Sequence, residues 1–166
     1  MAHARINLLG QQPGKGRKSG ASKKRRKDGQ PLGRLLIEAG ALTEEALDAA
    51  LAAQRQTFLP LGRILRDEYG VEEAAVAEAL RKQGHLPRVF LRFFPIDGKA
   101  IRILPLEYCQ EKEVVAFENL GDLLCVACAN PTRKDLEQEL AELTKLEVRL
   151  YRAPWEDIRR KLDLSV

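Results

Sequence analysis

The sequence predicts an α+β protein, in which an N-terminal helical subdomain of two tandem helical hairpins precedes a small β-β-α-β-α subdomain. Two observations support this prediction. A repeat with a period of 29 residues relates residues 31–54 to residues 60–83, and its apolar positions have helical spacing. Beyond the repeat, the pattern changes to short runs rich in β-branched and alternating apolar residues. We therefore expect a disordered basic tail over residues 1–30, the helical subdomain over 31–86 and the α+β subdomain over 87–166.

The tail carries most of the positive charge of the chain. Nine Lys and Arg residues and one acidic residue give residues 1–30 a net charge of +8, and since the whole chain carries +4, residues 31–166 carry −4. Residues 10–30 contain few apolar side chains and cannot bury enough surface to offset the entropy of ordering. The basic stretch 15–27 predicts either non-specific binding to nucleic acid or an anionic membrane surface, or a solubilising role.

Each copy of the repeat predicts a short helix followed by a longer one. Pro31 suits the first turn of the short helix and Gly40 suits a left-handed C-terminal cap. Thr43 is the expected N-cap of the longer helix, whose inner face continues through Leu47. In the second copy, Gly70 marks the corresponding break between the helices. Ten of the 24 aligned positions are identical: Pro31/Pro60, Leu32/Leu61, Gly33/Gly62, Arg34/Arg63, Leu36/Leu65, Glu44/Glu73, Ala46/Ala75, Ala50/Ala79, Leu51/Leu80 and Gln54/Gln83.

The C-terminal half predicts three strands and two helices. An extended, proline-bounded connection is expected over residues 89–97, and a hairpin turn over residues 119–122, which include Gly121. The expected strands and helices, in chain order, are strand 114–117, strand 123–129, helix 133–144, strand 146–151 and helix 154–162.

The side chains that carry catalysis are scarce. All three serines lie outside the expected folded body, and His85 is the one histidine beyond the tail. Cys125 and Cys128 fall within one expected strand, where residues three apart point to opposite faces, so we interpret them as core residues. The glycine-rich segment 10–20 does not match the phosphate-binding loop spacing. We therefore expect no enzymatic activity, no catalytic residue, no cofactor and no metal site.

The localisation is predicted from absences. The longest apolar run, residues 123–129, is far shorter than the roughly 20 residues of a membrane-spanning helix. The N-terminus lacks the apolar region of a signal peptide, and an odd number of cysteines is typical of reduced thiols. We expect a cytoplasmic protein.

The Leu-Gly-Arg triplets of the repeat are the candidate binding residues. Gly33 and Gly62 lie near helix starts, where backbone N–H groups favour anions. Arg34 and Arg63 are placed to reach a phosphate or to stack on a base. The alternative is that both glycines only permit close packing of helices.

The repeat resembles the signature of the MshEN family, the N-terminal domain of type II secretion and type IV pilus assembly ATPases. The family's form is [R]-L-G-x-x-L-L-x-x-G-L-L-x-x-x-x-L-x-x-x-L-x-x-Q, with a leading arginine, and two 24-residue copies of it are joined here by the five-residue spacer 55–59. The stretches Pro95-Ile96-Asp97 and LLCVACANP (residues 123–131) extend the similarity into the α+β half. No Walker motif follows, so we do not expect the ATPase domain here.

The resemblance implies a regulatory module that binds cyclic di-GMP, a two-fold symmetric nucleotide, with one half in each copy. The residues that it implicates are Leu32, Gly33, Leu36, Leu51, Gln54, Leu61, Gly62, Leu65, Leu80 and Gln83. Three departures stand out: Pro31 and Pro60 replace the family's leading arginine, Arg66 replaces an apolar residue, and Gly70 comes one residue late. The alternatives are docking to the secretion or pilus machinery without nucleotide, and tethering through the tail.

Overall fold

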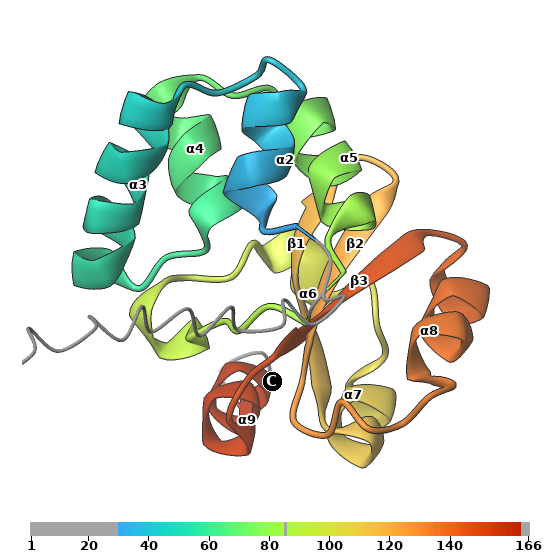
Figure 1. Ribbon diagram of the computed structural model, residues 1–166. Coiled ribbons are helices and arrows are strands. Elements are labelled where there is room, and N and C mark those ends of the chain that lie inside the picture. Colours follow the sequence, from blue (N-terminus) through green and yellow to red (C-terminus); the bar gives the residue numbers. More distant parts are fainter. Residues whose placement is uncertain (1–29, 85, 164–166) are drawn as a thin grey trace, which may run out of the picture.

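The computed structural model describes residues 30–84 and 86–163 (Figure 1). The predictions for the basic tail, for the segment 10–20 and for His85 lie outside these residues. The described chain has the predicted α+β class: four helices, α2–α5, precede a three-stranded sheet interspersed with further helices.

Helices α2 to α5 follow the two copies of the repeat. Helix α2 spans Leu32–Glu38, α3 spans Glu44–Thr57, α4 spans Leu61–Tyr69 and α5 spans Glu73–Lys82. Thr43 caps α3 as predicted, since its hydroxyl accepts a hydrogen bond from the Ala46 N–H at 3.2 Å. The role predicted for Pro31 was wrong: its extended backbone, with φ −61° and ψ 151°, makes it the residue before α2 rather than part of its first turn.

The second copy of the repeat keeps a glycine turn, displaced by one residue. Gly40 follows α2 with φ +73°, and Gly70 follows the longer helix α4 with φ +65°. Both are in the left-handed region that glycine adopts without steric cost. The late glycine therefore reflects a longer helix.

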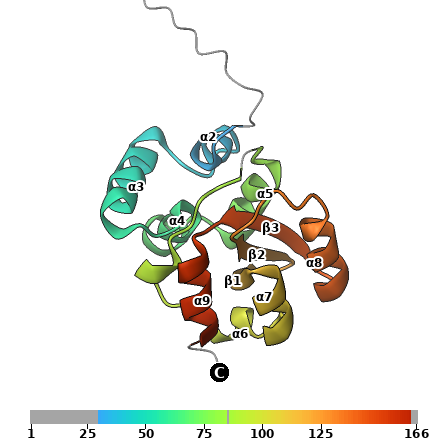
Figure 2. The same cartoon turned by 90° about the horizontal axis from the view of Figure 1, so that it is seen from below.

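The sheet has the order β1-β2-β3. Strand β1 (Val114–Leu120) is antiparallel to β2 (Leu123–Cys128), and β2 is parallel to β3 (Glu147–Arg152). Helix α8 (Leu136–Thr144) provides the crossover between the parallel strands. All six residues of β2 are buried, as expected for a central strand covered on both faces. Figures 1 and 2 show α2–α5 to one side of this sheet and α7 and α9 to the other.

Three short elements before the sheet were not predicted. The connection expected to be extended contains a 3₁₀ turn, η1 (Leu91–Phe93), and two helices follow, α6 (Gly98–Ile101) and α7 (Leu106–Lys112). Each is too short for a helical period to emerge from the sequence. The order β-β-α-β-α is correct from β1 onward; its helices are α8 and the closing helix α9 (Trp155–Asp163), and both begin later than predicted.

One continuous hydrophobic core connects the repeat to the sheet. It includes Leu36 and Leu65 from the repeat, Leu91 from η1 and Val126 from β2, all at most 1% exposed. None of the described helices has both the length and the apolar character needed to cross a bilayer.

Candidate functional site

A cavity of about 530 Å³ lies where the starts of α2 and α4 meet the inner faces of α3 and α5. Its size is within the roughly 300–1,000 Å³ range of small-molecule sites. Nine of the twelve predicted binding residues line it: Leu32, Gly33, Arg34, Leu51, Gln54, Leu61, Gly62, Leu80 and Gln83.

The two copies of the repeat contribute equivalent positions to this cavity. The lining contains five pairs related by the 29-residue period: Pro31/Pro60, Leu32/Leu61, Gly33/Gly62, Leu51/Leu80 and Gln54/Gln83. The lining therefore presents the same residue types twice.

The other three predicted residues lie elsewhere. Leu36 and Leu65 are both fully buried in the core. Arg63 is outside the cavity: its Nη1 donates to the Pro95 carbonyl oxygen at 3.4 Å, and its guanidinium lies 5.3 Å from the centre of the Phe94 ring. The pair Arg34/Arg63 is therefore identical in sequence but different in surroundings.

The two glycines allow close helix packing. A Cβ atom on Gly33 would lie 2.4 Å from Leu47 Cδ1, and one on Gly62 would lie 2.8 Å from Val76 Cγ1. Leu47 and Val76 are themselves equivalent positions of the repeat, on α3 and α5. Close packing of helices is therefore a role of both glycines, and contact with a ligand stays a prediction for both.

Both glutamines hold neighbouring segments in place. The Gln54 side-chain amide donates to the Leu59 carbonyl oxygen at 3.0 Å and so fixes the loop between α3 and α4. Gln83 is 7% exposed, and its side-chain oxygen accepts from Arg149 of β3 at 3.2 Å. Each glutamine thus both lines the cavity and ties one wall of it to an adjacent element.

The charges around the cavity are mixed. Arg34 pairs with Glu44 at 2.5 Å, so its charge is largely compensated. Asp48 adds a second carboxylate to the lining. Arg88 also lines the cavity, and among the described residues no carboxylate lies within ion-pair distance of it.

Arg88 belongs to a wall that sequence reasoning missed. Its segment is anchored to the C-terminal end of β3 by two backbone hydrogen bonds. The Val89 N–H donates to the Arg152 carbonyl oxygen at 2.9 Å, and the Arg152 N–H donates to the Pro87 carbonyl oxygen at 2.8 Å. Tyr151 of β3, 6% exposed, completes this wall. A sequence signal was present in the segment R-V-F-L-R-F, residues 88–93, which begins five residues after the end of the repeat and contains two arginines.

Arg66, the second departure, has a structural role. It forms ion pairs with Glu73 at 3.3 Å and with Glu118 of β1, and so joins α4 to the sheet. Burial raises the pKa of the Glu118 carboxyl, and the nearby Arg66 opposes this shift.

The cysteines are core residues, as predicted. Cys125 and Cys128 are buried on β2 as free thiols, and burial raises their pKa to about 12 and about 11. Within residues 30–84 and 86–163, no cluster of three or more His, Cys, Asp or Glu residues is suited to a metal ion.

Comparison with known proteins gives a family match and two related ATPases. The family model of the MshEN domain matches residues 85–165. The type IV pilus assembly ATPase PilB of Thermus thermophilus is 30% identical over 122 residues, which are 72% of this chain and 14% of that protein. PilB of Myxococcus xanthus is 25% identical over 132 residues, 80% of this chain and 23% of that protein. The chain thus spans less than a quarter of the length of either relative.

Two solved structures are also similar. The structure of MshE with cdg gives a TM-score of 0.46 at 25% identity and covers 82% of this chain and 99% of that chain. The N-terminal domain of XpsE gives 0.42 at 19% identity, with 78% of this chain and 90% of that chain covered.

Proposed function

Since residues 85–165 form an MshEN domain, related to the N-terminal domains of pilus and secretion ATPases, we propose that this chain is a non-catalytic regulatory module that binds cyclic di-GMP in the repeat cavity. In this proposal the helical subdomain, residues 31–86, senses the nucleotide, and the α+β subdomain, residues 87–166, passes that state to a partner in the pilus or secretion machinery. Both would act in the cytoplasm.

The five repeat-related pairs around one cavity are the observation that carries the proposal. A lining that presents the same residue types twice suits a ligand whose two halves are chemically identical. Cyclic di-GMP has two guanosine phosphate halves, and linking them makes the second contact intramolecular, which raises the overall affinity. We therefore expect cyclic di-GMP to bind far more tightly than GMP.

Arg88 is the residue that we expect to face the phosphates. The family's leading arginines are Pro31 and Pro60 here, Arg34 is paired with Glu44, and Arg63 lies outside the cavity. A guanidinium without a carboxylate partner is the group best suited to an anion. Asp48 also lines the cavity, and its carboxylate is a suitable acceptor for the N–H groups of guanine.

The experiment is calorimetric titration of the chain with cyclic di-GMP and with GMP at low ionic strength. Leu51→Trp places a bulky ring in the cavity at a half-buried position, and Leu143→Trp is its control on an exposed face of α8. We expect binding to be lost in the first variant and retained in the second. Arg88→Ala should weaken binding and its salt dependence, whereas Arg159→Ala, outside the cavity, should change neither. Absence of heat with the unaltered chain at tens of micromolar would contradict the nucleotide proposal.

Docking without a nucleotide is the second candidate function. The two prolines and the position of Arg63 favour it, because together they leave the cavity with fewer free cations than a dianionic ligand would favour. Calorimetry separates the two candidates, since a docking module gives no heat with the nucleotide.

The tail proposal is tested independently of the cavity. Deleting residues 1–30 should abolish salt-sensitive retention on DNA or on anionic vesicles. Retention that survives the deletion, or that does not respond to salt, would rule out tethering through residues 15–27.

A further inference from the structure

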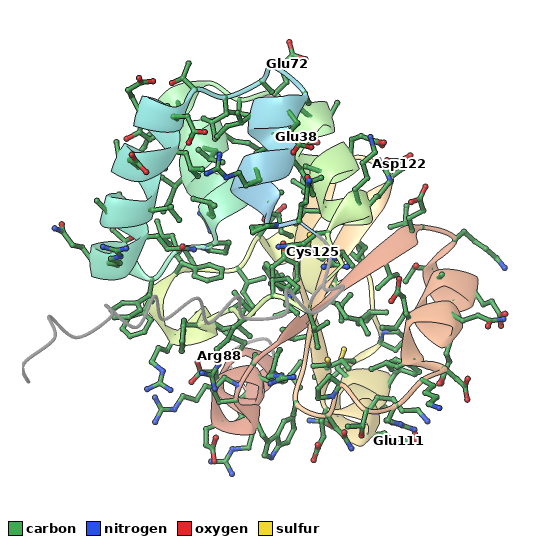
Figure 3. All side chains as sticks on the ribbon, in the orientation of Figure 1. Glu38, Glu72, Arg88, Glu111, Asp122 and Cys125 are labelled. Carbon is green, nitrogen blue, oxygen red and sulfur yellow. The ribbon has the colours of Figure 1, made fainter. Side chains whose placement is uncertain are left out.

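Three phenylalanines and two arginines form one exposed patch, which we call the aromatic–arginine surface: Phe58, Phe90, Phe93, Arg88 and Arg92. Phe58, at the end of α3, stacks on Phe93 of η1 with ring centres 4.6 Å apart and an interplanar angle of 20°. Phe90 meets Phe58 edge-on at 5.7 Å. Figure 1 shows the end of α3 and η1 side by side, and Figure 3 labels Arg88 at the same edge of the molecule.

The rings of this surface are incompletely buried. Phe58 is 42% exposed and Phe93 is 47% exposed, and among the described residues only Tyr69 and Leu143 are other large apolar side chains with comparable exposure. Single exposed apolar residues are common on protein surfaces, but Phe58 and Phe93 are two exposed rings in contact with each other. An exposed aromatic pair bordered by arginine has the composition of a protein-binding hot spot.

Phe58 ends α3 in a backbone conformation that is uncommon for a residue with a side chain. Phe58 has φ +57°, a left-handed conformation that a side chain makes unfavourable. The ends of α2 and α4 use glycine for the same turn, at φ +73° and +65°. At the end of α3, the chain keeps a large ring in a strained position and leaves it two-fifths exposed. Glu113 and Lys145 end α7 and α8 in the same conformation, so the case for this surface depends on the exposed rings and the arginines beside them.

The patch combines arginines with the aromatic rings, and Asp157 of α9 offsets part of the charge of Arg92. Residues 55–58 and 88–93 include Arg55, Arg88 and Arg92 and no Asp or Glu. The guanidinium of Arg88 lies 5.4 Å from the centre of the Phe90 ring, and that of Arg92 lies 5.8 Å from the Phe93 ring. Arg92 is anchored through its Nε, which pairs with the buried Asp157 at 3.1 Å. The rings therefore support guanidinium groups whose remaining N–H groups can bind carboxylates.

We propose that the aromatic–arginine surface binds an acidic segment of a partner protein, with one apolar side chain of that segment against Phe58 and Phe93 and its carboxylates on Arg88 and Arg92. A protein segment fits better than nucleic acid or a membrane for two reasons. Residues 31–166 carry a net charge of −4, which opposes an extended polyanion on the folded body. Two stacked rings offer contact area for one side chain and little beyond it. Arg88 also lines the cavity, so we expect cyclic di-GMP bound there to compete with the peptide for this guanidinium.

The test uses the full chain and labelled peptides in which several Asp and Glu residues flank one Phe or Leu. Two matched peptides replace either the acids by Asn and Gln or the apolar residue by Gly. Fluorescence anisotropy at low ionic strength gives the affinities. We expect the acidic apolar peptide to bind, and both matched peptides to bind about tenfold more weakly or not at all.

Variants locate the binding on the chain. Phe58→Ser with Phe93→Ser should weaken binding by about tenfold, and Arg88→Gln should weaken it and reduce its salt dependence. Leu143→Ser, which alters a side chain that is also 47% exposed, is the control and should change nothing. The basic tail is present in every variant, so its attraction for acidic peptides cancels in the comparison. Circular dichroism confirms that each variant is folded.

Four outcomes would overturn the proposal. The first is that no acidic apolar peptide binds, and the second is that the amide peptide binds equally well. The third is that the variant with Phe58→Ser and Phe93→Ser binds the peptide as tightly as the unaltered chain. The fourth is that this variant loses binding to DNA or anionic vesicles but keeps its binding to the peptides. Phe58 and Phe93 do not line the cavity, so their substitution should leave calorimetry with cyclic di-GMP unchanged, which separates failure of this proposal from failure of the cavity proposal.

Discussion

Substitution of Gly33 by alanine tests the packing at the start of the repeat. The new Cβ would lie 2.4 Å, 2.8 Å and 3.2 Å from Cδ1, Cδ2 and Cγ of Leu47. Because Cγ is itself crowded, rotating the two methyl groups does not relieve the clash, and Leu47 or α2 must move. Overpacking of this kind costs about 1–3 kcal/mol, and the higher helix propensity of alanine returns about 1 kcal/mol. The difference is a net loss of up to about 2 kcal/mol, and the middle of these ranges gives about 1 kcal/mol.

Two further substitutions make this prediction specific. At Gly62 the Cβ would make one short contact, 2.8 Å to Val76 Cγ1, so we expect a smaller loss of about 0–1 kcal/mol. At Gly98 the nearest atom is Arg102 Nη2 at 3.6 Å, so alanine should be neutral or slightly stabilising. Urea unfolding followed by circular dichroism measures all three. A Gly33→Ala chain as stable as the unaltered one would refute the reasoning.

Three other predictions follow from single residues. Lys145 is exposed and has φ +60° at the end of α8. Lys145→Gly should raise the free energy of unfolding by about 0.5–1 kcal/mol, whereas Lys145→Ala keeps the backbone strain and should not raise it. Urea unfolding compares the two variants. Burial raises the pKa of the Glu118 carboxyl. A carboxyl whose pKa is higher in the folded state than in the unfolded state contributes stability at a pH below its ordinary pKa. That contribution is lost as the pH rises through the pKa of the folded state. The unaltered chain should therefore lose stability relative to Glu118→Gln as the pH rises above about 4, the ordinary pKa of a glutamate carboxyl, and parallel pH profiles would contradict this. Burial raises the pKa of Cys109 to about 11, of Cys125 to about 12 and of Cys128 to about 11, so at pH 8 the folded chain should react with a thiol reagent at least about a hundredfold more slowly than the unfolded chain; fast reaction of even one thiol without unfolding would contradict it.

The helices of the repeat were predictable because their signals are local. Apolar spacing, the Thr43 cap and the glycines after α2 and α4 each act within a few residues of the chain. The strands were predictable for the same reason, since β2 is an unbroken apolar run. In contrast, η1, α6 and α7 consist of three, four and seven residues and depend on their packing against the sheet and α9.

The candidate site was predictable only in part, because equal residues can have unequal surroundings. Arg34 and Arg63 are identical in the repeat, yet Arg34 meets Glu44 and Arg63 meets the Pro95 carbonyl oxygen and the Phe94 ring. Periodicity compares the two copies with each other and contains no information about which third element each copy contacts. Arg88 was missed for the same reason, since it lies outside the repeat.

The wall formed by residues 86–88 and Tyr151 limits how the site could be transferred between proteins by exchange of segments. It is fixed to the cavity through β3, by the bonds between Arg152 and its neighbours Pro87 and Val89. A transplanted copy of residues 31–83 would carry all five symmetric pairs and still leave the cavity open on this side. The repeat and the sheet therefore cannot be exchanged separately between proteins without losing the site, and recombination within this architecture should preserve them as one unit.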